Sequence, residues 1–137
     1  MRIAFLILCG VQLLWFFGCI VTYRIAGKLL VEGMGVKSAE FGMFCAFTLG
    51  VVLYLAFPTA GIWVLRAVLT FWAVVQFFCH WYYTIFGASE KKLRGYNQCF
   101  RETIHLLPAS ETRVVPDLYH IVLHLLLLSN LLLSYFI

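Results

Sequence analysis

The chain of 137 residues is 64% hydrophobic and only 12% charged, and its formal net charge is +4. A soluble domain is about half apolar and about a quarter charged, so this composition excludes an ordinary soluble protein. The positive charge does not predict nucleic-acid binding, because the basic residues lie mostly beside apolar segments, where they set membrane topology and contact anionic headgroups. The five cysteines include no CxxC pair, so neither a disulfide framework nor a zinc motif is expected.

Four apolar segments are each long enough to cross a bilayer as a helix, which takes about 20 residues. Backbone groups in lipid need partners within their own segment, and the alternation typical of membrane barrels is absent. The sequence therefore predicts an all-α integral membrane protein, a single domain built as a four-transmembrane-helix bundle. The predicted spans are residues 3–23, 40–57, 62–86 and 118–137, with a short turn at 58–61.

The second predicted span carries a stripe of small residues, Gly42, Ala46 and Gly50, at positions i, i+4 and i+8. Such a stripe lets a neighbouring backbone approach closely, which is how membrane helices associate. The short turn at 58–61 favours a contact with the third span, and a homodimer face is the alternative. The four tryptophans are expected to serve in part as anchors at the membrane interface.

The loop between the third and fourth spans contains an amphipathic segment, residues 89–107. Ser89 is the predicted N-cap of a helix, and Pro108 is predicted to end it. The apolar residues of this segment recur at helical spacing: Leu93, Tyr96, Phe100, Ile104 and Leu107. A basic amphipathic helix beside a membrane usually lies in the interface, so an anchoring helix is predicted, with partner binding as the alternative.

The loop charges predict the orientation. Eight of the ten Lys and Arg residues lie in loops 24–39 and 87–116. The positive-inside rule makes these loops cytoplasmic and places both termini outside, in the plasma (inner) membrane.

One polar group of residues stands out within the spans, where ionisable side chains are costly. Asp117, His120 and His124 lie on one face of the fourth span, within about 60° of each other. The third span has Gln76, His80 and Thr84 on one face, with Tyr83 beside them. The histidines of both spans fall at similar depth on the cytoplasmic side, so the sequence predicts one cluster.

Several ligands suit such a cluster. His80, His120, His124 and Asp117 are a candidate metal-ligand set, and a facing histidine pair suits haem. A quinone or lipid headgroup, or a proton relay, is equally compatible with histidine chemistry. The structural alternative is that these residues only cap helix ends or meet interfacial water.

Three functions remain open from the sequence. The first is a small membrane protein that binds a metal, haem, quinone or lipid-like ligand at this cluster. The second is an accessory or scaffold subunit of a larger membrane complex, and the third is a small transporter working as a homo-oligomer. Whether the protein is an enzyme, which ligand it takes and its oligomeric state do not follow from the sequence.

Overall fold

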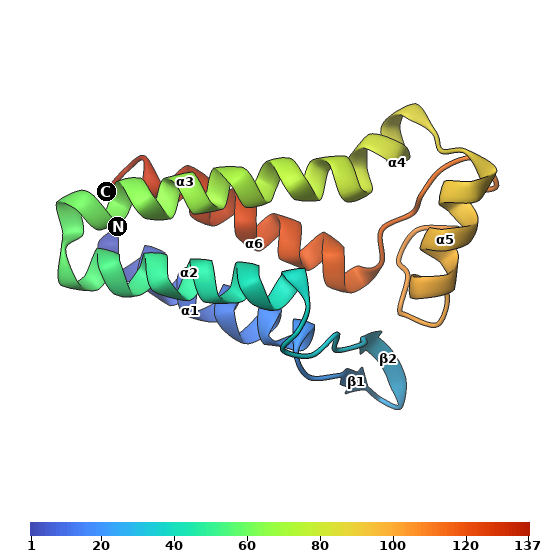
Figure 1. Cartoon of the computed structure of the whole chain (residues 1–137), viewed down its shortest axis with the longest axis horizontal. Coiled ribbons are helices and arrows are strands. Elements are labelled where there is room, and N and C mark those ends of the chain that lie inside the picture. Colours follow the sequence, from blue (N-terminus) through green and yellow to red (C-terminus); the bar gives the residue numbers. More distant parts are fainter.

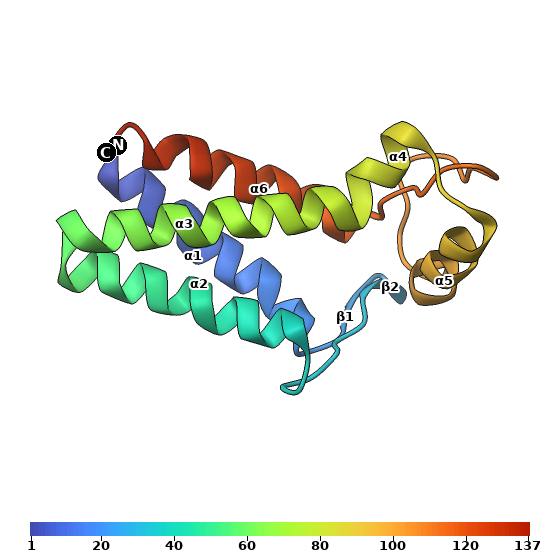
Figure 2. The same ribbon diagram turned by 45° about the horizontal axis from the view of Figure 1, so that its top comes forward.

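Four helices run along the long axis of the molecule in the computed structural model, which describes all 137 residues (Figure 1). They are α1 (Arg2–Phe16), α2 (Ala39–Ala56), α3 (Pro58–Gln76) and α6 (Leu118–Ser134). Helix α2 packs most extensively on α3, while α1 and α3 both pack on α6 (Figure 2). Both chain termini lie together at one end, so the histidine-bearing ends of α3 and α6 are at the other (Figure 1).

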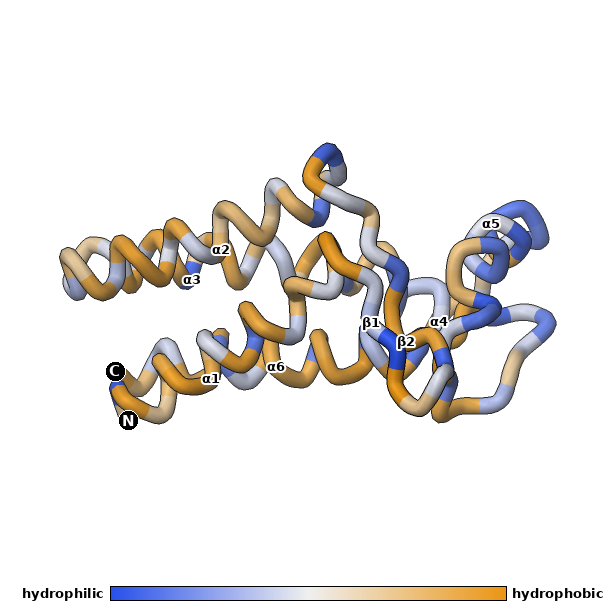
Figure 3. The backbone as a smooth tube through the Cα atoms, turned by 90° about the horizontal axis from the view of Figure 1, so that it is seen from below, coloured by the Kyte–Doolittle hydropathy of each residue, from blue (hydrophilic) through white to orange (hydrophobic).

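Three helical stretches are long and apolar enough to cross a membrane: Arg2–Cys19, Ala39–Ala56 and Pro58–Phe86. Helix α6 is also apolar but has only 17 residues. Hydrophobic residues run along the helices, whereas hydrophilic ones gather at the end opposite the termini (Figure 3). Large side chains on the outer faces are more than half exposed, among them Ile3, Leu49 and Leu132. Extended apolar surface of this kind marks contact with a membrane or a partner.

The connection between α2 and α3 is tighter than the predicted turn at 58–61. Only Phe57 separates the two helices, and Pro58 is the first residue of α3. Proline suits that position because the first-turn N–H has no helical partner in any case. Gly61 then lies directly against α2, where a Cβ atom would come within 2.4 Å of the Tyr54 Cα and of the Leu53 carbonyl carbon.

The loop after α1 contains a short antiparallel hairpin, β1 (Tyr23–Ile25) and β2 (Lys28–Val31), so the all-α prediction missed two strands. Ala26 and Gly27 both have positive φ, which suits a two-residue hairpin turn. The strands are too short for an alternating pattern to stand out in the sequence. The Ile104 N–H donates to the Leu29 carbonyl at 3.1 Å, which fastens the hairpin to the segment before α6.

Helix α5 (Glu90–Phe100) is shorter than the predicted 89–107. Ser89 caps it as expected, accepting from the Lys92 N–H at 3.3 Å, but Pro108 does not end it. Residues 103–104 instead lie beside β2. The apolar side of α5 is buried within the protein, where Leu93 and Tyr96 pack with Val114. The apolar face of α5 is therefore covered by the protein itself, and its position at the membrane interface stays a prediction.

The core between the long helices is aromatic. Trp72 is 1% exposed, and its ring centroid lies 4.3 Å from that of Phe16 and 5.6 Å from that of Phe47. An interfacial role is therefore wrong for Trp72.

The predicted small-residue stripe of α2 contacts α3 at one of its glycines. A Cβ on Gly50 would meet the Leu65 side chain of α3 at 2.9 Å, whereas a Cβ on Gly42 would have nothing within 4 Å.

A polar contact joins α1 to α6 deep in this core. The Asn130 side-chain amide donates to Gln12 Oε1 at 2.6 Å, and both residues are fully buried. Replacing Asn130 with leucine is expected to cost about 1–2 kcal/mol, because the Gln12 carbonyl then has no donor. The neighbouring Ser129→Ala variant, on the exposed side of α6, is the control and should change stability by less than about 0.5 kcal/mol. Unfolding by SDS titration in mixed micelles measures both.

Candidate functional site

Helix α3 continues without a break into a π-helical turn (Phe77–Trp81) and then α4 (Tyr82–Phe86). A π turn is wider than an α turn and often occurs at functional sites. Here it brings the side chains of Gln76 and Trp81, five residues apart, onto the same partner in α6. His80 lies within the turn and is 6% exposed.

The structure brings together the three histidines that the sequence placed at one depth. The ring centroid of His80 is 4.2 Å from that of His120 and 5.4 Å from that of His124, and the His120 and His124 centroids are 6.3 Å apart. Asp117 and Gln76 also belong to this group through hydrogen bonds to His120 and His124. We call these five residues, with Tyr96, the histidine cluster.

His124 has both ring nitrogens engaged. Its Nδ1 accepts from the Trp81 indole N–H at 2.6 Å, since an indole can only donate. Its proton therefore sits on Nε2 and is donated to Gln76 Oε1 at 2.9 Å. These two bonds hold His124 as one neutral tautomer and leave it no nitrogen for a ligand.

His120 is paired with a carboxylate. Asp117 Oδ1 caps α6 by accepting from the His120 backbone N–H at 2.9 Å, and it also accepts from the His120 Nδ1–H at 2.7 Å. Burial alone favours the protonated acid, but the bonds from His120 outweigh it and hold the pKa of Asp117 below its ordinary value. Asp117 is therefore an acceptor that orients the His120 ring and leaves Nε2 without a protein partner.

Tyr96 is the member of the cluster that the sequence did not reveal. Its hydroxyl lies 2.7 Å from His80 Nδ1, and the ring is 7% exposed. Burial raises the pKa of Tyr96 above its ordinary value, so the phenol stays protonated. Phe100, also on α5, covers His120 with a ring-centroid distance of 5.0 Å. The only sequence signal was the apolar spacing of α5, which is equally typical of a membrane-facing helix.

Two predicted members lie outside the cluster. The Thr84 hydroxyl contacts the carbonyls of His80 and Val114, which ties α4 to the segment before α6. Tyr83 packs with Lys92, whose ammonium lies 4.6 Å from the ring centroid. His105 is exposed, lies after the end of α5 and is apart from the other histidines.

The placement of the free donor atoms bears on the metal and haem predictions. No group of three or more His, Cys, Asp or Glu side chains is placed to hold one metal ion. The Nε2 atoms of His80 and His120 and Asp117 Oδ2 have no hydrogen-bond partner in the protein, so these are the atoms of the predicted set that could bind a ligand. The ring centroids of His80 and His120, 4.2 Å apart with planes inclined by 35°, leave no room for a flat macrocycle between them.

Comparison with protein-family models, with curated proteins and with solved structures gives no match for this chain. The site is therefore interpreted from its own chemistry.

Replacing Trp81 with phenylalanine tests the hydrogen bonding of His124. The variant keeps an aromatic ring but removes the indole N–H, so Nδ1 loses its donor and the single tautomer is no longer imposed. We expect a loss of about 1 kcal/mol in unfolding free energy. Nitrogen NMR of labelled histidine should show one neutral Nε2–H tautomer for His124 in the parent protein and a mixture in the variant. An unchanged spectrum would contradict this assignment.

Proposed function

We propose that the chain crosses the membrane four times, with both termini outside and loops 24–39 and 87–116 in the cytoplasm. Three helices of sufficient length and apolarity support this arrangement. Helix α6 is about 26 Å long, and the apolar residues after it extend the fourth span toward the bilayer thickness of about 30 Å. The neighbouring termini are consistent with an even number of crossings (Figure 1).

Reporter fusions test this topology. A phosphatase that folds only outside the cytoplasm should be active when joined to the C-terminus after residue 137. The same enzyme inserted after residue 110, within the loop before α6, should be inactive. Activity of the second fusion would contradict the proposed orientation.

We further propose that the histidine cluster binds the oxygen-bearing head of a membrane-soluble ligand, such as a quinone. The observation that carries this proposal is a pair of adjacent imidazoles with unpartnered Nε2 atoms, His80 and His120, each oriented through its other nitrogen. The His120 side chain is 12% exposed, so a ligand can approach it from outside the bundle.

One arrangement of the protons gives the two free nitrogens opposite characters. With Nδ1–H donating to Asp117, neutral His120 presents Nε2 as an acceptor. A phenol hydroxyl can donate or accept, and we take Tyr96 as the donor to Nδ1, so that neutral His80 carries its proton on Nε2 and presents a donor. A donor and an acceptor side by side suit a group that does both, the hydroxyl of a reduced quinone, and the donor also suits a quinone carbonyl.

A binding titration tests this function. A short-chain quinone should quench the tryptophan fluorescence of the purified protein, because Trp81 contacts the cluster through His124. His120→Ala should weaken binding at least about tenfold, the equivalent of one hydrogen bond of about 1.4 kcal/mol. His105→Ala, a histidine outside the cluster, is the matched control and should bind normally. Equal affinity of the His120→Ala and parent proteins would overturn the proposal.

A further inference from the structure

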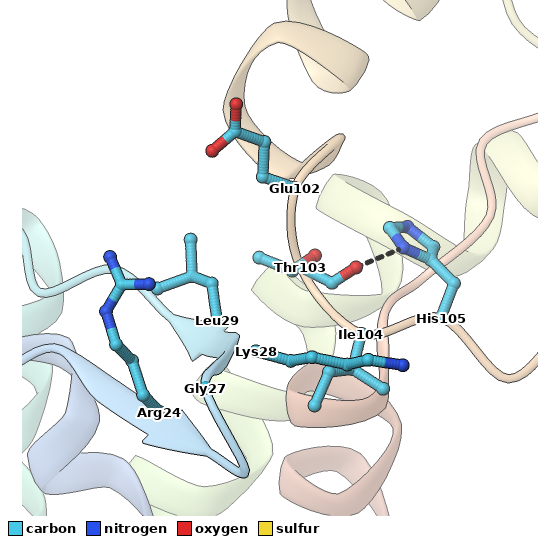
Figure 4. Close-up of a pocket in the computed structure, with 8 residues that line it drawn as sticks. All are labelled: Arg24, Gly27, Lys28, Leu29, Glu102, Thr103, Ile104 and His105. Carbon is cyan, nitrogen blue, oxygen red and sulfur yellow. Dashed lines mark hydrogen bonds between the residues drawn. The ribbon is translucent and has the colours of Figure 1, made fainter.

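A polar hollow lies apart from the histidine cluster, between the hairpin and the segment before α6 (Figure 4). It measures about 400 Å³ and is lined by residues from two distant parts of the chain, 24–29 and 102–105. The Leu29 carbonyl accepts from the Ile104 N–H, and the Ile104 carbonyl accepts from the Leu118 N–H at 2.8 Å. The hollow is therefore built from backbone that is fastened to the first residue of α6.

The lining is cationic. Arg24 and Lys28 are exposed, and neither forms an ion pair with a carboxylate. His105 Nδ1–H donates to the Thr103 carbonyl at 2.9 Å, which leaves the other ring nitrogen free. In Figure 4 the Lys28 side chain extends toward the His105 side of the hollow, and the Arg24 guanidinium lies on the other side. Glu102 is the one acidic residue of the lining.

Exposed apolar side chains flank these cations. Ile25 in the hairpin is 51% exposed, and Leu106 and Leu107, directly after the lining segment, are 63% and 47% exposed. Water does not favour such side chains, whereas the boundary between headgroups and acyl chains does. In the proposed topology, attachment to the start of α6 puts the hollow at the level where the fourth span ends. Cations and apolar side chains at this level match the two parts of a phospholipid.

We propose that this hollow binds the phosphate of an anionic phospholipid, which Arg24 and Lys28 attract from two sides of the hollow, with Ile25, Leu106 and Leu107 beside the acyl chains. Arginine and lysine are the usual phosphate ligands of proteins, and each cation near an anionic membrane surface strengthens attachment about fivefold. Glu102 weakens binding by repulsion and keeps it reversible. The proposal rests on the proposed membrane topology but not on ligand binding by the histidine cluster.

Native mass spectrometry of the full-length protein in detergent tests the site, with phosphatidylglycerol and phosphatidylcholine of identical acyl chains as probes. The parent protein should retain phosphatidylglycerol preferentially. The double variant Arg24→Gln/Lys28→Gln should lower its affinity for phosphatidylglycerol about thirtyfold. Glu102→Gln should raise the affinity. All substituted side chains are exposed, and circular dichroism verifies that the variants fold.

The matched control is Lys37→Gln/Lys91→Gln, which removes two exposed cations elsewhere at the same end of the molecule. It should change the affinity less than about threefold if the site is local. An equal loss in this control would show diffuse charge attraction and overturn the proposal. So would unchanged affinity in Arg24→Gln/Lys28→Gln. A competition experiment with inorganic phosphate distinguishes the two sources of the phosphate group. Displacement of phosphatidylglycerol by an equimolar amount of inorganic phosphate would show a site for soluble phosphate rather than for lipid.

Discussion

Replacing Gly61 with alanine is expected to destabilise the protein by about 3 kcal/mol or to prevent its folding. The new Cβ would lie 2.4 Å from backbone atoms of Leu53 and Tyr54 on α2. Backbone cannot move aside as a flexible side chain can, so α2 and α3 would have to separate at their tightest point. Because these two helices form the most extensive helix contact in the molecule, the loss should spread through the core.

Gly42→Ala is the matched control, since that glycine is also helical but has nothing within 4 Å. Alanine is the better helix former, so this variant should be neutral or more stable by up to about 1 kcal/mol. Thermal unfolding in detergent, followed by circular dichroism, measures both proteins. A Gly61→Ala variant that unfolds at the parent temperature would show that α2 and α3 do not pack this closely.

Replacing Asp117 with alanine is expected to cost about 3 kcal/mol. The carboxylate is fully buried, caps α6 and accepts the His120 Nδ1–H at 2.7 Å. Loss of a cap costs about 1 kcal/mol, and loss of a hydrogen bond to a charged group about 2 kcal/mol. Asp117→Asn keeps an acceptor oxygen at the cap and should lose no more than about 1 kcal/mol. SDS titration of the two variants distinguishes them, and equal losses would contradict a capping role.

The pH dependence of stability provides a second test of the role of Asp117. Because the pKa of Asp117 is lowered in the folded protein, the unfolded chain binds the proton more tightly. The resulting stabilisation is complete at neutral pH and is lost as the pH falls below about 4, through the ordinary value toward the folded one. Asp117→Asn should lack this part of the acid-induced loss. Identical acid profiles for the parent and Asp117→Asn would show that the carboxylate is not stabilised by folding.

Much of the site followed from the sequence because helical periodicity is local. The spacing of Asp117, His120 and His124, and the matching depth of His80, predicted residues that the structure brings together. The same periodicity wrongly placed Thr84 in the cluster and did not predict that Trp81 contacts it. An ideal helix repeats every 3.6 residues, and the π turn at Phe77–Trp81 departs from that repeat, so Trp81 reaches His124 instead.

The apolar segments by themselves determined that the protein is mostly helical, with three helices able to cross a membrane, because hydropathy and length are properties of the chain alone. Only the tertiary structure shows that Tyr96 of α5 covers His80 and that the apolar side of α5 packs on Val114. It also decided that residues 24–29 meet 102–105 around a hollow. These contacts join segments far apart in the chain, and no local pattern specifies which distant backbone will supply a partner.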